Sequence, residues 1–583
     1  MERLGPPNIK YRILFSPIWP VLALVFFITT IIMTALFIWM VAKPSQQPMT
    51  LSTRNPSIFE IPCPRQPPLL ELPNPLPKAI KDSLTLIDDH LKSLAKTAQN
   101  KSAISVNIFY RDKVIWRGHY GSKVYRGSKA PDDDTRYRIG SVTKIFPVIL
   151  LYKLYQDGMI TSLDDPLSKY APNFHINNPF TETNITLRQI ASQMSGIPRE
   201  ASCGFSCNNT NSSEQLDFLK SQNLVIEPWT SPSYSNLGYA LLGRLLTENL
   251  LNTTFEEWVE KQVLQPLGMK DTGFEISKKV LENMALPYSP DGKVLPFMNV
   301  GWAAPAGQMY STTNDLMKLA KMFTTVDGQG ILKRETIHHM LLPDFITRDG
   351  LWLWGSPWEM RFVKGFLARQ KGGNIDSYNA VFSVIPEMKM GVSVLVNAAY
   401  VFPARSMSCF VIADLIHSTV LPALNETLFE MRRHQSFPIE SKPFLGEYSV
   451  TQFIKSTGKV FNSTITIKSN MDTMVAMMNH SMDSLSAGFV LKYIGKPLLL
   501  QATVISAVNS SCLFPHLGVL GMVEFNAPGP GGLCDGFSVI FFDSLFVGKR
   551  IKSSNKLPDT PFKEKISLWR EEDFLFDQRF SIN

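Results

Sequence analysis

The pattern of hydrophobic and polar residues along the chain shows a long apolar run near the N-terminus. Residues Val21–Ala42 contain no charged side chain, and about twenty apolar residues are enough to cross a bilayer core. We therefore expect a transmembrane helix over residues 21–42. A cleaved signal peptide is the alternative, although its apolar stretch is usually shorter. Basic residues precede the run, which favours a cytoplasmic tail over residues 1–20 and places the bulk of the chain on the lumenal or extracellular side.

The segment after this run is dominated by proline. Prolines recur from Pro44 to Pro77, a density that opposes helix formation and favours an extended, polyproline-like chain. We expect a stalk over residues 43–78. The stretch Ala79–Ala98 then places apolar residues at helical spacing, which predicts an amphipathic helix at the start of the folded region.

Helical and strand periodicities alternate over the following block, residues 79–425. We expect helices at Ser141–Gln156, Asn236–Asn249 and Thr313–Phe323, and strands at Ile104–Tyr110, Val114–Tyr120, Ala380–Ile385 and Gly391–Asn397. A mixture of helices and strands along one block predicts an α/β domain.

The pattern changes again beyond about Phe437, where short strand-like runs replace the helical periodicity. These runs are Gly446–Val450, Ser463–Lys468, Thr473–Met478, Phe489–Tyr493, Leu498–Ile505, Val519–Phe525 and Phe537–Phe542. They predict a separate β-rich domain over residues 438–583. Its boundary with the preceding block is expected between residues 425 and 438.

Composition narrows the class of protein. The chain has 583 residues, 44% hydrophobic and 19% charged, which is more than one ordinary domain and enough for a sizeable core. The net charge of +8 is small for this length, and no basic run with interleaved aromatic residues is present. We therefore expect no nucleic-acid partner.

Two features agree with a location in the secretory pathway. Acceptor sequons Asn-x-Ser/Thr stand at Asn100, Asn184, Asn208, Asn211, Asn252, Asn425, Asn462, Asn479 and Asn509. The cysteines are even in number and stand at Cys63, Cys203, Cys207, Cys409, Cys512 and Cys534. Disulfides are expected, first between Cys203 and Cys207 and next between Cys512 and Cys534, with isolated buried thiols as the alternative.

The first motif whose side chains could carry out catalysis is Ser141-x-x-Lys144, at the start of an expected helix. Positions i and i+3 share a helix face, so a desolvated, neutral Lys144 could accept the proton of the Ser141 hydroxyl. The motif is weak alone, because the same spacing recurs at Ser93/Lys96, Ser456/Lys459 and Ser553/Lys556 without supporting context.

Two further elements follow in order. Tyr234-x-Asn236 supplies a phenol, whose proton is lost more readily beside lysines, and an amide that can orient a substrate or a lysine. Lys371-Gly372-Gly373-Asn374 places a positive charge beside glycines that allow a close backbone approach. Taken singly, Tyr234 could be a core aromatic residue and Lys371 a surface turn.

Taken together, the three elements resemble the signature motifs of serine β-lactamases and penicillin-binding proteins. The tyrosine version is similar to the branch of class C β-lactamases, D-Ala-D-Ala carboxypeptidases and related esterases. Framework segments also match it, at Leu163–Pro166, Ile185–Pro198, Pro266–Met269 and Pro305–Thr312. The resemblance covers roughly Ile104–Ala399, and the anchor, stalk and sequons are similar to those of animal membrane-anchored β-lactamase-like proteins.

This resemblance implies an antiparallel sheet flanked by helices, a helical subdomain, and a site between them with Ser141 at a helix N-terminus. It implies Ser141 as nucleophile, with Lys144 and Tyr234 sharing general-base and general-acid work. The substrate-binding residues would be Asn236, Lys371, Gly372, Gly373 and Asn374, and the oxyanion hole would use the N–H groups of Ser141 and Asn374. No metal or organic cofactor is expected, and the partner would be a small-molecule or peptide substrate.

Some positions depart from the family pattern. Gly372 lacks a hydroxyl that could bind a carboxylate, and Asp376 adds a negative charge near the third motif. Gln193-Met194 replaces the family's usual His-Thr or His-Gln before Ser195-Gly196. These changes bear on substrate class more than on the fold. We expect a membrane-anchored serine hydrolase acting on an amide or ester, with a catalytically silent binding or scaffold protein of the same fold as the alternative. A zinc site at His338-His339 is not expected, because no His-Glu-x-x-His motif accompanies it.

Overall fold

The computed structural model describes residues 69–204, 207–325, 328–398, 409–433, 439–470, 473–480, 487–504, 519–541 and 544–551. The expected transmembrane helix and residues 43–68 of the expected stalk therefore lie outside the described residues. Within these ranges, no helix combines the length and the apolar character that a bilayer crossing requires.

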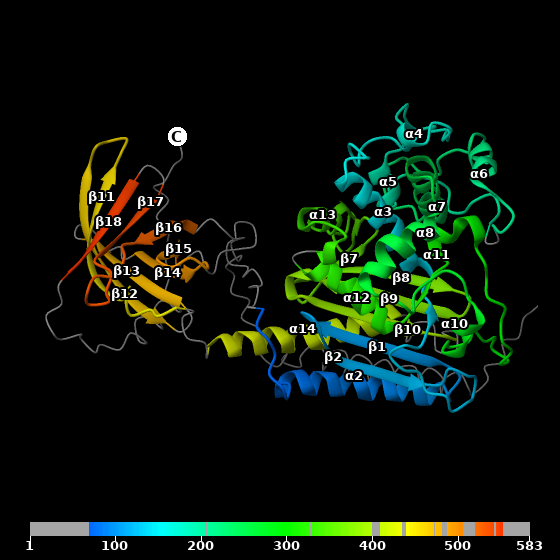
Figure 1. Ribbon diagram of the computed structural model, residues 1–583, viewed down its shortest axis with the longest axis horizontal. Helices are drawn as coiled ribbons and strands as arrows, with labels where there is room; N and C mark the ends of the chain where they lie inside the picture. Colours follow the sequence, from blue (N-terminus) through cyan, green and yellow to red (C-terminus); the bar gives the residue numbers. More distant parts are fainter. Residues whose placement is uncertain are drawn as a thin grey trace, which may run out of the picture. The chain divides into compact units, whose positions relative to one another are not determined.

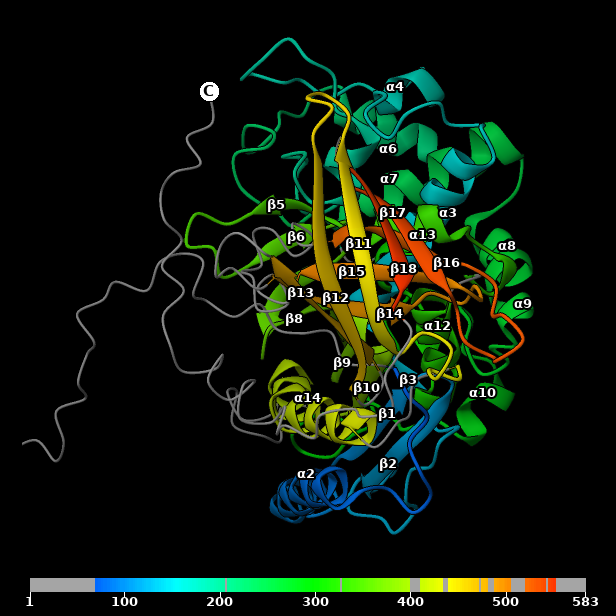
Figure 2. The same cartoon turned by 90° about the vertical axis from the view of Figure 1, so that its left-hand side faces the viewer.

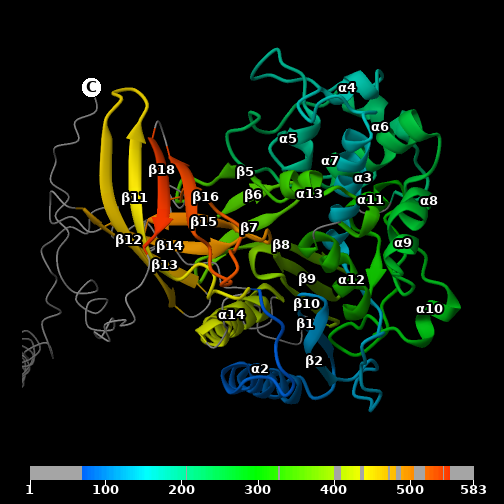
Figure 3. The same ribbon diagram turned by 60° about the vertical axis from the view of Figure 1, so that its left-hand side comes forward.

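The first folded body is built on an eight-stranded antiparallel sheet in the order β2-β1-β10-β9-β8-β7-β6-β5 (Figure 3). Its strands are β1 (Ala103–Tyr110), β2 (Lys113–Gly121), β5 (Pro343–Ile346), β6 (Leu353–Gly355), β7 (Glu359–Val363), β8 (Phe366–Ile375), β9 (Tyr378–Ile385) and β10 (Met390–Val396). The four strands predicted from sequence correspond to β1, β2, β9 and β10. Because β1 pairs with β10, the first and last strands of this body lie side by side within the sheet, one strand in from its β2 edge.

Two long helices cover one face of this sheet (Figure 1). The helix α2 (Lys78–Thr97) buries the apolar stripe predicted for it, and α14 (Cys409–Arg433) packs beside α2 and against β9 and β10. Apolar side chains of the two helices and the sheet form one cluster. The helix α14 continues without a break to Arg433, beyond residue 425.

The other face of the sheet carries the remaining helices and the larger apolar core. These are α3 (Ile145–Gln156), α4 (Leu167–Tyr170), α5 (Leu187–Ala191), α6 (Ser212–Leu219), α7 (Asn236–Leu246), α8 (Phe255–Val259), α9 (Gln265–Leu267), α10 (Lys278–Glu282), α11 (Ala304–Gly307), α12 (Thr313–Thr324) and α13 (Arg334–Met340). A short ladder of β3 (Tyr137–Arg138) and β4 (Tyr310–Ser311) joins this region. The α/β fold with an antiparallel sheet and a helical part is thus confirmed.

The helix α3 explains how the core positions the expected site. Its residues are apolar on nearly every side and almost all buried, as expected for a helix at the centre of a core. A 3₁₀ turn, η1 (Gly140–Lys144), leads into α3 from β3. The motif Ser141-x-x-Lys144 therefore stands on a tight turn at the start of a rigid, buried helix.

The C-terminal body is a closed, antiparallel eight-stranded barrel whose strands pair in chain order (Figure 2). They are β11 (Gly446–Ile454), β12 (Val460–Asn470), β13 (Thr473–His480), β14 (Ala487–Tyr493), β15 (Leu499–Val504), β16 (Val519–Phe525), β17 (Gly536–Phe541) and β18 (Ser544–Arg550). The predicted β-rich character is confirmed. The closing strand β18 was not predicted, because its outward residues Leu545 and Val547 are apolar and break the alternation that marks a half-buried strand.

The cysteines agree with one expectation and contradict another. Cys203 and Cys207 form a disulfide, with their Cα atoms 5.1 Å apart, as predicted. Cys534 is instead a free thiol in the apolar interior of the barrel, so the expected pairing with Cys512, a residue outside the described ranges, is wrong. Its backbone N–H is bound by the carbonyl of Pro443, which holds the thiol on the inner side of the barrel.

Candidate active site

The Ser141 hydroxyl and the Lys144 amine meet on the η1 turn. Ser141 is half-buried, while Lys144 is completely buried. Lys144 Nζ lies 3.1 Å from Ser141 Oγ, as the spacing predicted. The other Ser-x-x-Lys pair that the structure describes on a helix, Ser93/Lys96, stands on the exposed side of α2 and has no such environment.

Lys144 is held by neutral acceptors rather than by a carboxylate. Its Nζ donates to Asn236 Oδ1 at 2.6 Å and to the carbonyl of Ala306 at 2.8 Å. Among the described residues, no acidic side chain forms an ion pair with it. Burial, together with the charge of Lys371, lowers the pKa of Lys144 below the ordinary lysine value of 10.5, so its neutral form is more accessible than that of a surface lysine.

Tyr234 completes the hydrogen-bonded group around the serine. Its hydroxyl lies 2.5 Å from Ser141 Oγ. Burial alone would raise the pKa of Tyr234, but the charges of Lys144 and Lys371 outweigh this effect and lower it below the ordinary value of 10.0. The phenol is therefore prepared to give up or share its proton.

The loop that carries Tyr234 is fixed by Gln193, one of the positions that depart from the family pattern. The Gln193 side-chain oxygen accepts from the Ser235 N–H at 2.7 Å, and its main-chain carbonyl accepts from the Ser233 N–H at 2.8 Å. Ser235 then caps α7, because its hydroxyl accepts from the Gly238 N–H. Gln193 thus has a structural role beside the site.

Asn236, at the start of α7, is oriented by a carboxylate that sequence analysis did not single out. Its Nδ2 donates to both oxygens of Glu200, at 2.8 and 3.0 Å, which turns Oδ1 toward Lys144. The neighbouring Arg199 donates from Nε to Glu200 Oε1 at 3.1 Å. In this structure Asn236 therefore orients Lys144.

Lys371, on β8, is engaged with a second unpredicted carboxylate, Glu359 on β7. Lys371 Nζ donates to Glu359 Oε1 at 2.6 Å and to the carbonyl of Gly372 at 2.9 Å, and the Gly372 N–H donates to Glu359 Oε2 at 3.1 Å. Although burial opposes the charge, Glu359 and Tyr234 together raise the pKa of Lys371 above 10.5. Lys371 therefore remains a cation beside Tyr234.

The two glycines of the third motif have different steric roles. A Cβ at Gly372 would lie 2.3 Å from the Phe410 ring, on the α14 side of the sheet. A Cβ at Gly373 would lie 2.0 Å from the carbonyl oxygen of Ile139 and 2.8 Å from the backbone nitrogen of Ser141. Gly373 thus allows β8 to lie directly against the turn that carries the serine.

Gly140, with a positive φ of 49°, completes this close approach from the other side. A Cβ at Gly140 would lie 2.8 Å from the backbone nitrogen of Asn374. The main chains of residues 140–141 and 373–374 are therefore packed together, as an oxyanion hole built from the N–H groups of Ser141 and Asn374 requires. The Asn374 side chain is exposed and bonds to Asn379.

Asp376, the other departure in the third motif, does not add a free charge to the site. It is buried and forms an ion pair with the fully buried Arg138, with Nη1 and Oδ2 3.4 Å apart. Its Oδ1 also accepts from the Met298 N–H at 3.3 Å. The Arg138–Asp376 pair ties the β8–β9 turn to β3.

The structure brings all eight predicted site residues into one region, and it adds Glu200 and Glu359. No motif marks these two glutamates: Glu200 lies 36 positions before Asn236, and Glu359 reaches Lys371 from the neighbouring strand β7, so both contacts depend on the folded chain. Within the described ranges, no group of three His, Cys, Asp or Glu side chains is arranged to hold a metal ion. His339 instead packs edge-on against Tyr152.

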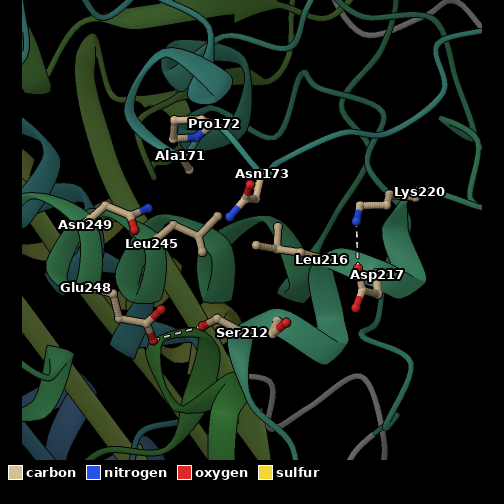
Figure 4. Close-up of a pocket in the computed structure, with 11 residues that line it drawn as sticks. Ala171, Pro172, Asn173, Ser212, Leu216, Asp217, Lys220, Leu245, Glu248 and Asn249 are labelled. Atoms are coloured by element: carbon tan, nitrogen blue, oxygen red, sulfur yellow. Dashed lines mark hydrogen bonds and ion pairs between the residues drawn. The ribbon is translucent and has the colours of Figure 1, made fainter.

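A cavity of about 370 Å³ lies apart from these residues, between α6, the end of α7 and the segment Ala171–Asn173 (Figure 4). Ser212 donates to Glu248 within its lining at 2.9 Å. None of the eight predicted site residues lines it.

Comparisons with known proteins agree with this geometry. The profile of the Beta-lactamase family matches residues 87–408, a span that includes the whole site. The human protein "Putative beta-lactamase-like 1" is 35% identical over 397 residues, which cover 66% of this chain and 78% of that protein. "Beta-lactamase-like protein 2" of Dictyostelium discoideum is 30% identical over 342 residues, 57% of this chain and 62% of its own length.

Among solved structures, "A class C beta-lactamase" superposes with a TM-score of 0.50 at 20% identity, over 58% of this chain and 96% of that chain, which supports the fold. The sequence matches and the arrangement around Ser141 lead to one conclusion: this chain belongs to the beta-lactamase family, whose members are generally serine hydrolases.

Proposed function

We propose that this protein is a serine hydrolase that cleaves an amide or ester through a covalent acyl-enzyme on Ser141. One observation carries the proposal: Ser141 Oγ lies 3.1 Å from a buried lysine amine and 2.5 Å from a phenol, and none of the carboxylates that the structure describes pairs with that amine. A hydroxyl flanked by two groups of lowered pKa is an activated nucleophile.

The hydrogen bonds of Lys144 suggest how the proton moves. A neutral lysine has two N–H groups and one lone pair. The two N–H groups are used by Asn236 Oδ1 and the Ala306 carbonyl, so the lone pair faces Ser141 Oγ. As Oγ attacks the substrate carbonyl carbon, its proton passes to the Lys144–Tyr234 pair, which then protonates the leaving amine or alcohol.

The backbone would stabilise the negative charge that develops on the substrate oxygen. The N–H groups of Ser141 and Asn374 donate to this oxyanion in the tetrahedral intermediate. In the second half of the reaction, water gives a proton to the same Lys144–Tyr234 pair and attacks the acyl-enzyme carbonyl. The acid is released and Ser141 regains its proton.

We further propose that the protein is a single-pass membrane protein whose catalytic domain lies outside the cytosol. The uncharged run over residues 21–42 and the Cys203–Cys207 disulfide support this location. The Asn side chains of several sequons are also exposed on turns or loops, at Asn100, Asn184, Asn208 and Asn252. A substrate would then be a lumenal or extracellular small molecule or peptide.

Covalent labelling tests the proposed chemistry. The full chain is incubated with a fluorophosphonate and with a penicillin-type acylating agent, beside Ser141→Ala and the matched control Ser93→Ala, and the adduct is located by peptide mass spectrometry. We expect labelling of Ser141 that persists in Ser93→Ala and is lost in Ser141→Ala. A folded protein that neither reagent labels would favour the alternative, a silent binding or scaffold protein.

A further inference from the structure

Three cationic side chains surround the Tyr234 ring, but they differ in their access to solvent. Lys144 Nζ, Arg199 Cζ and Lys371 Nζ lie 4.8, 5.1 and 5.4 Å from the ring centroid. The two lysines are buried, whereas the Arg199 side chain is 64% exposed. Arg199 is therefore the member of this group that an incoming substrate can contact directly.

The base of the Arg199 side chain is held in place and its end is open. Its main-chain carbonyl accepts from the Asn236 N–H at 2.7 Å and from the Leu237 N–H at 3.2 Å, which fixes the residue to the start of α7. Its Nε is bound to Glu200. Its two terminal nitrogens have no hydrogen-bond partner among the described residues, so the fork of the guanidinium remains free.

Glu200 leaves the Nη groups of Arg199 available for a ligand. One Glu200 oxygen accepts from both Asn236 Nδ2 and Arg199 Nε, and the other accepts from Asn236 Nδ2. Both carboxylate oxygens are thus engaged by Asn236 Nδ2 or Arg199 Nε, and neither bonds to the Nη groups of Arg199. A guanidinium held at Nε over an aromatic ring is well prepared for bidentate binding of a carboxylate.

The third motif offers little to an anionic substrate. Lys371 is 2% exposed, and its amine is occupied by Glu359 and by the Gly372 carbonyl. Gly372 has no hydroxyl, and the space into which its side chain would point is filled by Phe410. Lys371 is therefore poorly placed to bind a substrate carboxylate, and its charge acts instead on Tyr234.

We propose that Arg199 is the specificity-determining residue of this site and that it binds a carboxylate carried by the substrate. The inference rests on the proposed function and deepens it: the substrate class becomes anionic esters or amides. Arg199 makes the contact through its two Nη groups while Glu200 holds Nε. It takes no part in the bond changes at Ser141.

Matched esters separate this role from a structural one. The full chain is assayed with the p-nitrophenyl monoester of glutarate and with p-nitrophenyl pentanoate, which have equal chain lengths and differ in the terminal carboxylate. A second pair carries the carboxylate on the leaving phenol. The variants are Arg199→Gln and Arg199→Lys, and the control is Arg126→Gln, because Arg126 is also exposed and stacks on a tyrosine, Tyr125, at 5.6 Å.

We expect Arg199→Gln to lower kcat/KM for the anionic ester of one pair by about 10-fold or more, mainly through KM, as loss of a charged hydrogen bond predicts. The neutral partner should change less than about 3-fold, Arg199→Lys should fall between, and Arg126→Gln should change neither. An equal loss on anionic and neutral esters would show that Arg199 acts only through Tyr234, and no loss on any ester would exclude its role altogether. Either result overturns the inference.

Binding that needs no turnover keeps the two proposals apart. 5-Phenoxypentanoate, a carboxylate without an ester or amide bond, is titrated calorimetrically into the full chain and into Arg199→Gln. If Arg199→Gln binds this ligand more weakly, but neither the esters nor the acylating agents modify Ser141, the anion site is supported and the proposed hydrolase activity is refuted. If Ser141 is acylated, but ligand binding and ester turnover do not change in Arg199→Gln, the hydrolase activity is supported and the anion site is refuted.

Discussion

The substitution Gly373→Ala tests whether the close approach of β8 to the serine turn is required for chemistry. The added Cβ would lie 2.0 Å from the Ile139 carbonyl oxygen and 2.8 Å from the Ser141 backbone nitrogen. Because both neighbours are backbone atoms, no side-chain rotation can relieve the contact. The strand and the turn must separate by at least about 1 Å to reach an ordinary carbon–oxygen distance.

Such a separation should cost more in activity than in stability. Overpacking a well-packed region costs about 1–3 kcal/mol, which a domain of this size tolerates. A misplacement of about 1 Å at reacting groups lowers the rate by about 100-fold. We therefore expect Gly373→Ala to fold, to lose about 1–3 kcal/mol in denaturant unfolding, and to acylate about 100-fold more slowly.

The assay is the rate of fluorophosphonate labelling, followed by intact-protein mass and paired with an unfolding curve. The control is Gly531→Ala, since Gly531 has open space around its Cα and no positive φ. This variant should label at the wild-type rate. The reasoning would be refuted if Gly373→Ala retained more than about one third of the wild-type rate, because the steric contact would then have no bearing on the oxyanion hole.

Three further predictions concern charge and modification. Acylation of Ser141 should accelerate as pH rises through the pKa of Lys144, which burial lowers below 10.5. In a pH series of labelling rates, Lys144→Met should lose this pH dependence and react at least about 100-fold more slowly. Glu359→Gln should lose about 3–5 kcal/mol in denaturant unfolding by leaving Lys371 buried without its partner, and adding Lys371→Met should recover much of the loss. Since Glu359 raises the pKa of Lys371, the pair contributes fully to the free energy of unfolding below the pKa of lysine in the unfolded chain, and this contribution is lost as pH rises through the folded pKa. In an alkaline series, the difference in unfolding free energy between wild type and Glu359→Gln should therefore shrink. After secretory expression, glycopeptide mass spectrometry should find a glycan on Asn252, which is exposed at a left-handed turn, and none on Asn425, whose side-chain oxygen is buried in α14; the reverse pattern would contradict the proposed exposure.

Local pattern was sufficient for much of this protein. Periodicity located α2 and α12, because each of these helices buries one regular face and its sequence shows it. The strands β1, β9 and β10 are buried on both faces and were recognised by their apolar and β-branched content. The three motifs also singled out Ser141, Lys144, Tyr234 and Lys371, which the fold brings together, since the spacing within a motif is a local property of the chain. The barrel was recognised as β-rich, although its closing strand was missed because its outer face is apolar.

Only the tertiary structure decided which groups control those motifs. Glu200 and Glu359 lie 36 and 12 positions from the residues they hold and reach them only once the chain has folded and β7 has paired with β8, so no spacing rule could assign them. The same is true of Phe410 filling the space beside Gly372, and of Asp376 being neutralised by Arg138. Sequence determines which side chains can do chemistry, whereas pKa, orientation and access depend on distances between distant segments, and these distances exist only in the folded chain.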